Sequence, residues 1–184
     1  MDTNIHVVRA TVEHENFSED ISNLIYEASK DKGAGLAQRS PNYILNKIRE
    51  GKAVIAFVNK EIAGFCYIET WEHEKFVANS GLIVSPKYRG LGIAKLIKEE
   101  AFRLSRELYP DAKLFGLTTS EAVMKINSDL GYRPVSYLKL TDDDAFWKGC
   151  ETCINYDILT RMQRKICLCT GMIFDPNEKN KKNK

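Results

Sequence analysis

The sequence predicts one α/β (α+β) domain, with strands and helices in the order β-α-α-β-β-β-α-β-α-β-β. Three observations favour this fold class. The chain has 184 residues, of which 43% are hydrophobic, and this is enough for one full core. Its apolar residues repeat with the strand period in some segments and the helix period in others. The expected strand at residues 76–84 runs directly into a glycine-rich turn and an amphipathic helix.

The first half of the chain contains four expected strands and two expected helices. Apolar runs predict the strands, at residues 5–12, 52–58, 62–70 and 76–84. Apolar residues at helical spacing predict the helices, at residues 17–30 and 41–51. Pro41 suits the first turn of the second helix because that position needs no backbone N–H. Asn59-Lys60-Glu61 joins the second and third strands as an expected hairpin.

The second half continues with two helices and three strands. The helices are expected at residues 93–108 and 122–130, ended by Pro110 and by Gly131 as a C-cap. The strands are expected at residues 113–118, 132–140 and 166–174. The domain would then span residues 1–174, with a cysteine-containing insertion at 141–165. Residues 175–184 are mostly Lys, Asn and Glu, which predicts a disordered polar tail.

The most informative segment is Arg89-Gly90-Leu91-Gly92-Ile93-Ala94, at the junction between a strand and a helix. Two glycines leave the backbone bare there, and a helix N-terminus favours anions. The segment therefore predicts a cradle for a phosphate or pyrophosphate, with Arg89 as a cation at its edge. No Lys-Ser or Lys-Thr follows, which excludes a P-loop, and Lys95 stands where a dinucleotide fingerprint needs its third glycine.

Arg89, Gly92 and Ala94, preceded by Val84 and Pro86, resemble the acyl-CoA signature of the GNAT acyltransferase superfamily. The resemblance implies a mixed, mostly antiparallel sheet flanked by helices. Two central strands would separate, the ones ending at Val84 and at Thr118, and the pantetheine arm would lie between them. The residues implied to bind acetyl-CoA are Ile83, Val84, Arg89, Gly90, Leu91, Gly92, Ile93, Ala94, Lys95 and Asn127.

Three lysines, Lys87, Lys95 and Lys98, flank the glycine cradle. We expect them to meet the 3′-phosphate or the pyrophosphate of CoA. The alternative is that they belong to a solvated helix face.

Acyl transfer to an amine needs a base for the amine and a proton donor for the departing thiolate. The resemblance implies a tyrosine as donor, but Asn127 occupies that position, and an amide cannot act as an acid. Tyr132 and Tyr137 are substitute donors. Glu69 is the best candidate for the base, followed by Glu72 and His73. Asn79 and Ser80, on the strand before the cradle, are candidates for positioning the substrate or a water molecule.

The loop at residues 32–40 is expected to line the acceptor site. Arg39 at its end would hold a substrate carboxylate with two parallel hydrogen bonds, if it is not simply a surface arginine. The chain also resembles GNAT proteins associated with arginine biosynthesis, in which glutamate is N-acylated. That resemblance implies an amino acid as the acceptor.

Four cysteines lie in or after the insertion, as Cys150-x-x-Cys153 and Cys167-x-Cys169. Two short chelating pairs can supply the tetrahedral ligands of a structural zinc ion. We expect Cys167 and Cys169 to point to one face of the last strand. Buried thiols that act as small hydrophobes, or a thiol redox pair, are the alternatives.

These features predict an enzyme that transfers an acetyl group from acetyl-CoA directly to a primary amine of a small molecule. A non-catalytic acyl-CoA sensor and a protein N-acetyltransferase are the alternatives. A net charge of +2 argues against nucleic acid or an acidic membrane as a partner. The N-terminus lacks an apolar signal segment, so we expect a cytoplasmic protein, and a homodimer is the assembly considered.

Overall fold

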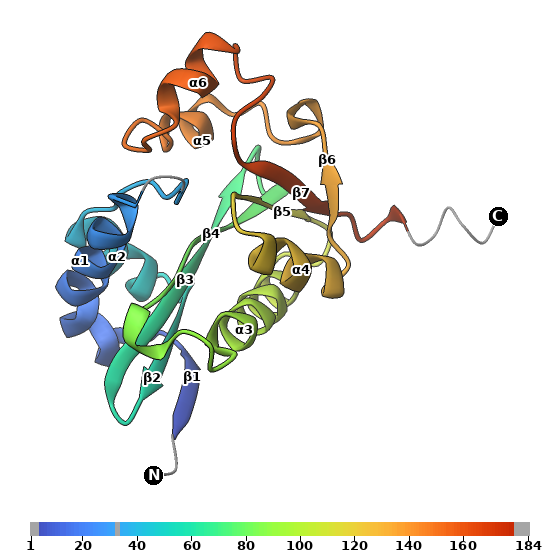
Figure 1. The fold of residues 1–184 in the computed structure, drawn as a ribbon. Coiled ribbons are helices and arrows are strands. Elements are labelled where there is room, and N and C mark those ends of the chain that lie inside the picture. The colour runs from blue at the N-terminus through green and yellow to red at the C-terminus, as the bar shows by residue number, and fades with distance from the viewer. Residues whose placement is uncertain (1–3, 32–33, 179–184) are drawn as a thin grey trace.

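The computed structural model describes residues 4–31 and 34–178 of the chain. Seven strands form one sheet in the order β1-β2-β3-β4-β5-β7-β6 (Figure 1). Neighbouring strands are antiparallel except for β4 and β5, which are parallel. The predicted mixed, mostly antiparallel sheet is therefore confirmed.

The strands are β1 (Ile5–Arg9), β2 (Ala53–Val58), β3 (Glu61–Trp71), β4 (Phe76–Val84), β5 (Lys113–Thr118), β6 (Arg133–Val135) and β7 (Thr170–Phe174). The helices are α1 (Ser18–Ser29), α2 (Pro41–Arg49), α3 (Ile93–Leu108), α4 (Glu121–Asp129), α5 (Asp144–Lys148) and α6 (Tyr156–Arg161). Ser40 caps α2, since its hydroxyl accepts a hydrogen bond from the Tyr43 amide. No helix of the described residues has the length and apolar character needed to cross a membrane.

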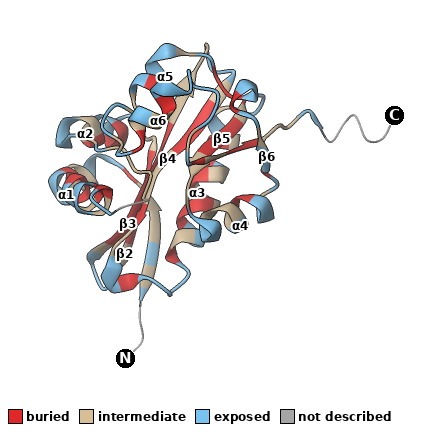
Figure 2. Ribbon diagram, turned by 45° about the horizontal axis from the view of Figure 1, so that its top comes forward, coloured by how far each residue is buried: buried red, intermediate tan, exposed pale blue. Residues whose placement is uncertain are grey.

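Helices cover both faces of the sheet, with α1 and α2 on one face and α3 and α4 on the other (Figure 1). The alternation of side chains along β2 explains this arrangement. Val54 belongs to the core under α3, whereas Ile55 belongs to the core under α1 and α2. Figure 2 shows buried residues along the central strands and on the sides of the helices that face them. A third core, around Phe115 and Trp147, holds α5 and α6 against the end of the sheet.

Three expected elements differ from the structure. β1 ends at Arg9, and residues Val12–Phe17 form a 3₁₀ turn before α1. The expected strand at 132–140 is reduced to β6, followed by a 3₁₀ turn at Tyr137–Lys139. β7 begins at Thr170 and not at residue 166, so Cys167 and Cys169 precede the strand and strand alternation does not orient them.

The first four residues of the expected tail, 175–178, are among the described residues. Asp175 forms an ion pair with Lys113, at 3.3 Å, and Glu178 forms one with Arg133. Both pairs attach the chain after β7 to the edge of the sheet. The rest of the predicted tail, residues 179–184, lies outside the described residues.

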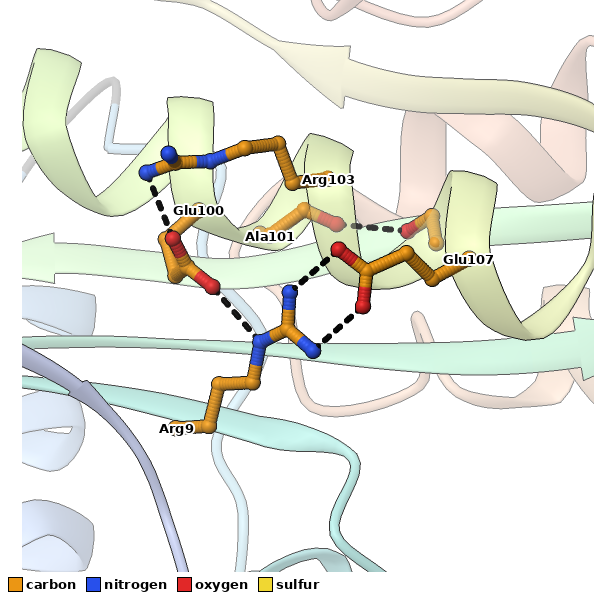
Figure 3. A network of polar contacts seen from close by, with 6 residues as sticks. Arg9, Glu100, Ala101, Arg103 and Glu107 are labelled. Carbon is orange, nitrogen blue, oxygen red and sulfur yellow. Dashed lines mark hydrogen bonds and ion pairs between the residues drawn. The ribbon is translucent and has the colours of Figure 1, made fainter.

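Arg9 ties the first strand to α3 (Figure 3). Its Nε donates to Glu100 at 2.6 Å, and its two Nη atoms donate to the carboxylate of Glu107 at 2.6 and 2.8 Å. Glu100 also pairs with Arg103 on the same helix. Exposed ion pairs add little stability. A fork-shaped guanidinium with three bonds does, however, fix the direction of α3 across the sheet, and α3 begins at the glycine cradle.

Gly64 of β3 tests how closely α3 packs on the sheet. A Cβ at this position would lie 2.6 Å from Ile97 Cδ1 and 2.7 Å from the carbonyl oxygen of Ile83. Because a backbone atom cannot move away cheaply, Gly64→Ala should lower the free energy of unfolding by about 2 kcal/mol in urea titrations. Gly116→Ala is the matched control, since its Cβ would lie 3.5 Å from Asn79 O, an ordinary contact. Equal losses in the two variants would contradict the close packing of β4 and α3 around Gly64.

Candidate active site

The central feature of the site is the separation of β4 from β5. The two strands pair only where Phe76–Ala78 faces Lys113–Phe115. Beyond Ala78, β4 continues to Val84, while β5 continues to Thr118 in partnership with β7. The predicted gap between the strands that end at Val84 and Thr118 is therefore present. A cavity of about 470 Å³ is lined by both separated edges, residues 79–82 of β4 and 116–118 of β5.

The glycine cradle lies at the start of α3. Gly90 and Gly92 have φ of +84° and +76°, and a Cβ on either would meet nothing within 4 Å. The amides of Lys95 and Leu96 donate to Gly92 O. The amides of Ile93 and Ala94 come too early in the helix to have an intrahelical acceptor. Two N–H groups and the positive end of the helix are thus available to an anion, with Arg89 exposed beside them.

The cradle and the cavity are separate parts of the site. None of the cradle residues 89–95 lines the cavity, and neither do Ile83 and Val84. Leu82 of β4 and Lys98 of α3 are cavity residues from the same elements. A ligand that reaches from the cradle into the cavity must therefore be long, with its anionic group outside and its far end between the strands.

The expectation for the three lysines is wrong for Lys98. Lys87 is exposed and pairs with Glu61 at 2.6 Å, and exposed Lys95 lies 3.9 Å from Glu99. Lys98, by contrast, is only 2% exposed and lines the cavity beneath α3. Its ammonium cannot reach a phosphate at the surface of the cradle. The physical reason is the rotation of α3, which turns Lys98 toward the sheet along with Ile97 and Ala101.

Asn79 is at the centre of a buried polar network. Its Nδ2 donates to Ser105 Oγ at 2.9 Å, and its Oδ1 accepts from Tyr132 Oη at 2.9 Å and from Lys98 Nζ at 3.4 Å. Asn79 and Ser80 both line the cavity, but Tyr132 does not. Burial raises the pKa of Tyr132 well above its usual range. As a proton donor, Tyr132 would have to act through Asn79.

Asn127 lies in the cavity wall on α4 with an unsatisfied acceptor. The residue is 1% exposed, and its Nδ2 donates weakly to Met172 Sδ at 3.6 Å. Its Oδ1 is buried without a hydrogen-bond partner. Because a buried polar atom normally has a partner, the free Oδ1 points to a ligand that donates a hydrogen bond. This placement fits the predicted role of Asn127 toward the CoA arm.

Glu69 lines the opposite part of the cavity. Its carboxylate accepts from the hydroxyl of Tyr43 and from Lys47 Nζ at 2.7 Å. Glu72 instead accepts from Thr141 Oγ1 at 2.6 Å and from the Asp142 amide, where it supports the start of the insertion. Neither Glu72 nor His73 lines the cavity. Of the three candidate bases, Glu69 is therefore the one placed to face a bound acceptor.

Arg39 closes one end of the cavity. Its Nε donates to Tyr67 Oη at 2.8 Å, and its Nη1 donates to Gln38 O at 2.8 Å and to Gly149 O at 3.1 Å. The Gln38 amide also donates to Thr152 Oγ1 at 2.9 Å. Two of the three guanidinium nitrogens are thus occupied, Nε by Tyr67 of β3 and Nη1 by the carbonyls of Gln38 and Gly149, of which Gly149 belongs to the insertion. Only Nη2 is left for a substrate, so the structure does not support the two-bond grip expected of Arg39.

The four cysteines Cys150, Cys153, Cys167 and Cys169 all line the cavity. Burial raises the pKa of Cys150 to about 11 and that of Cys169 to about 12, which favours thiols over thiolates. Among the described residues, which include all four, no group of three or more Cys, His, Asp or Glu side chains could hold a metal ion. The predicted zinc site is therefore not supported, since the segment before β7 does not bring the sulfur atoms into a ligating arrangement.

Sequence reasoning missed two further residues of the cavity. Trp71, at the end of β3, and Asn155, just before α6, each bury an unpaired N–H group, Nε1 and Nδ2 respectively. Together with Asn127 they account for every unpaired buried side-chain atom in the described parts of the chain. The only sequence signal was the position of Trp71 two residues after Glu69, and nothing marked Asn155.

The sequence matches the Acetyltransferase (GNAT) family over residues 21–124, more than half of the chain. The chain therefore belongs to the GNAT family of acetyltransferases, and the resemblance seen in residues 84–94 is confirmed. Among proteins of curated function, no significant sequence match is found.

Solved structures with the same fold include three acetyltransferase-like proteins. N-acetylglutamate synthase from Neisseria gonorrhoeae, complexed with coenzyme A and N-acetyl-glutamate, is 16% identical with a TM-score of 0.66; the match covers 95% of this chain and 36% of the synthase. Rv2747 from Mycobacterium tuberculosis, in complex with CoA, is 13% identical with a TM-score of 0.65, covering 92% and 98% of the two chains. Phosphinothricin acetyltransferase from Sinorhizobium meliloti, in complex with AcCoA, is 13% identical with a TM-score of 0.63, covering 95% and 89%.

These likenesses concern the fold. The chain spans about a third of the length of the Neisseria synthase.

The cradle can be tested with two glycines in matched surroundings. Gly92→Val places a β-branched residue at φ +76° and should reorient the amides of the cradle, weakening CoA binding at least tenfold in calorimetric titrations. Gly51→Val is the control, because Gly51 has φ +65°, and its Cβ would also meet nothing within 4 Å. Both variants should lose similar stability, but only Gly92→Val should lose CoA. Unchanged CoA affinity in Gly92→Val would contradict the cradle.

Asn127→Leu separates a ligand role from a structural one. Removing the unpaired Oδ1 relieves a buried polar group, so the unliganded protein should melt about 2 °C higher. If Oδ1 accepts a hydrogen bond from CoA, the affinity for CoA should fall about fivefold. Thermal melting with and without CoA measures both effects. A variant that is less stable and binds CoA normally would show that Asn127 is structural.

Proposed function

We propose that this protein is an acetyl-CoA-dependent N-acetyltransferase that acts on a primary amine of a small molecule by direct transfer. The observation that carries the proposal is the separation of β4 from β5, with an anion cradle at one side and a cavity between the strands at the other. A long thioester with a pyrophosphate fits this arrangement. Membership of the GNAT family and the neighbours' complexes with CoA or AcCoA support it.

The acceptor that the cavity favours carries an acidic group beside its amine. Trp71 Nε1 and Asn155 Nδ2 are buried donors without acceptors, and Nη2 of Arg39 is a third donor in the same cavity. Donors of this kind complement carboxylate or similar oxygens. An amino acid meets this requirement, and the Neisseria structure holds an acetylated one, N-acetyl-glutamate. The carboxylate of Glu69 would attract the ammonium of the acceptor and take its proton directly or through water.

The surroundings of the cavity favour a small acceptor over a protein. The loop that ends at Arg39 and the insertion are joined by hydrogen bonds to Gly149 and Thr152, which covers the acceptor end. A lysine on a folded protein would need an open groove there. The sensor alternative rests on a different observation, namely that Asn127 stands where the resemblance implies a tyrosine.

The test measures thiol release from acetyl-CoA with pairs of acceptors, each an amino acid and its decarboxylated amine. The amino acid should have the higher kcat/KM by about tenfold or more, because it alone satisfies the buried donors. Gly92→Val should release no thiol.

Three outcomes separate the alternatives. CoA binding without thiol release for any acceptor would favour the sensor. Equal rates within each pair would leave the enzyme but remove the acidic acceptor. Acetylation of added proteins in preference to amino acids would favour a protein acetyltransferase.

A further inference from the structure

Lys98 is a buried amine in the wall of the cavity between β4 and β5. Four elements of the described structure, β4, α3, β5 and α4, form this part of the cavity. They supply residues 78–82, Lys98, residues 116–118, Val123 and Asn127. Lys98 is the single titratable side chain in this set. From β3, Tyr67 also lines the cavity, with its ring beside Gly81, but its hydroxyl already accepts a hydrogen bond from Arg39 Nε.

The amine of Lys98 has no anionic partner. Its Nζ contacts Asn79 Oδ1 at 3.4 Å and lies 5.3 Å from the centre of the Tyr132 ring. Within the described residues, no carboxylate forms an ion pair with it. An ammonium has three donors, and only one of them has an acceptor. Burial of an unpaired amine is costly, and an apolar side chain would be more stable at this position.

The titratable groups around Lys98 are thiol and phenol groups. Cys66 on β3 and Tyr132 at the start of β6 are its neighbours, and Asn79 on β4 does not titrate. Burial raises the pKa of Cys66 to about 11 and raises that of Tyr132 further. Both are therefore neutral at ordinary pH. Burial lowers the pKa of Lys98, so its ammonium gives up a proton more readily than that of an exposed lysine.

We propose that Lys98 is the catalytic proton donor to the CoA thiolate, a role that Asn127 cannot fill. The inference rests on the proposed function, which places the thioester between β4 and β5. The amine nitrogen of the acceptor bonds to the carbonyl carbon, and the carbon–sulfur bond breaks with its electron pair left on sulfur. Lys98 gives one proton from Nζ to that sulfur and becomes a neutral amine. The proton lost by the new amide nitrogen restores the ammonium, so the sum is an amide and a thiol.

The other proton carriers are less well placed. Tyr132 lies behind Asn79 and outside the cavity wall. Glu69 is on β3 and is held by Lys47 and Tyr43. The cavity cysteines lie in or next to the insertion, where the acceptor is proposed to bind. The proposed base, Glu69 of β3, is thus near the acceptor, and the proposed acid, Lys98 of α3, is near the sulfur.

The test titrates the thiol of bound CoA and needs no knowledge of the acceptor. The ultraviolet absorbance of the thiolate is followed against pH for CoA complexes of the wild type and of Lys98→Met. Complexes with desulfo-CoA, titrated in parallel, cancel the five cysteines of the protein. An ammonium next to sulfur should lower the apparent pKa of the bound thiol by about one unit or more. Lys98→Met should lose this shift, while Lys125→Met, which removes an exposed lysine of α4, should keep it.

The outcomes distinguish the two proposals. Failure of the wild type to bind CoA would overturn the proposed function. CoA binding with a thiol pKa no lower than that of free CoA would overturn the role of Lys98 by itself, without use of any variant. Equal thiol pKa values in wild type and Lys98→Met would do the same. With an accepted amine, Lys98→Met should also lower kcat at least tenfold and leave the KM for acetyl-CoA within about twofold.

Discussion

The interrupted pairing of β4 and β5 is the constraint on which the rest of the structure depends. Three residue pairs join the strands, and then each strand turns to a different neighbour. β4 remains bonded to β3, and β5 pairs with β7 from Leu114 to Thr118. Beyond these pairs, the backbone N–H and C=O groups on the facing sides of β4 and β5 have no partner strand. Each strand still keeps its other neighbour, so both remain inside the sheet. The separation creates a place for a ligand that can supply the missing hydrogen bonds.

α3 is used twice in this arrangement. Its first turn offers amides to an anion, and Lys98, in the second turn, faces the cavity. Arg9 holds the same helix through Glu100 and Glu107, and Gly64 lets it lie directly on β3. One helix therefore sets the distance between the cradle, where we propose that phosphate binds, and the cavity, where we propose that the thioester reacts. Errors in that distance are costly because catalysis depends on position to within about 1 Å.

Local signals in the sequence predicted the strand, turn and helix around Gly92 because glycines and apolar spacing determine them within a few residues. Lys98 was predicted at the surface because local spacing does not distinguish it from Lys95, three residues earlier. Only the contact of α3 with the sheet shows which of the two is inside. The helical row of Lys98, Ala101 and Ser105 carried that signal. Trp71 and Asn155 line the same cavity only because of the tertiary fold, so local sequence patterns could not place them together. Family resemblance supplied the separation of the strands, which periodicity cannot show.

The join between the acceptor loop and the insertion has a consequence for how this site can change. Arg39 Nη1 donates to the main-chain carbonyls of Gln38 and Gly149, which every residue type possesses. This part of the join can therefore persist when side chains of the insertion change, provided that Thr152, whose Oγ1 accepts from the Gln38 amide, is kept. Position 149 is the exception. A Cβ there would lie 3.0 Å from Phe146 O and 3.3 Å from Arg39 Nη2, so this close approach favours glycine.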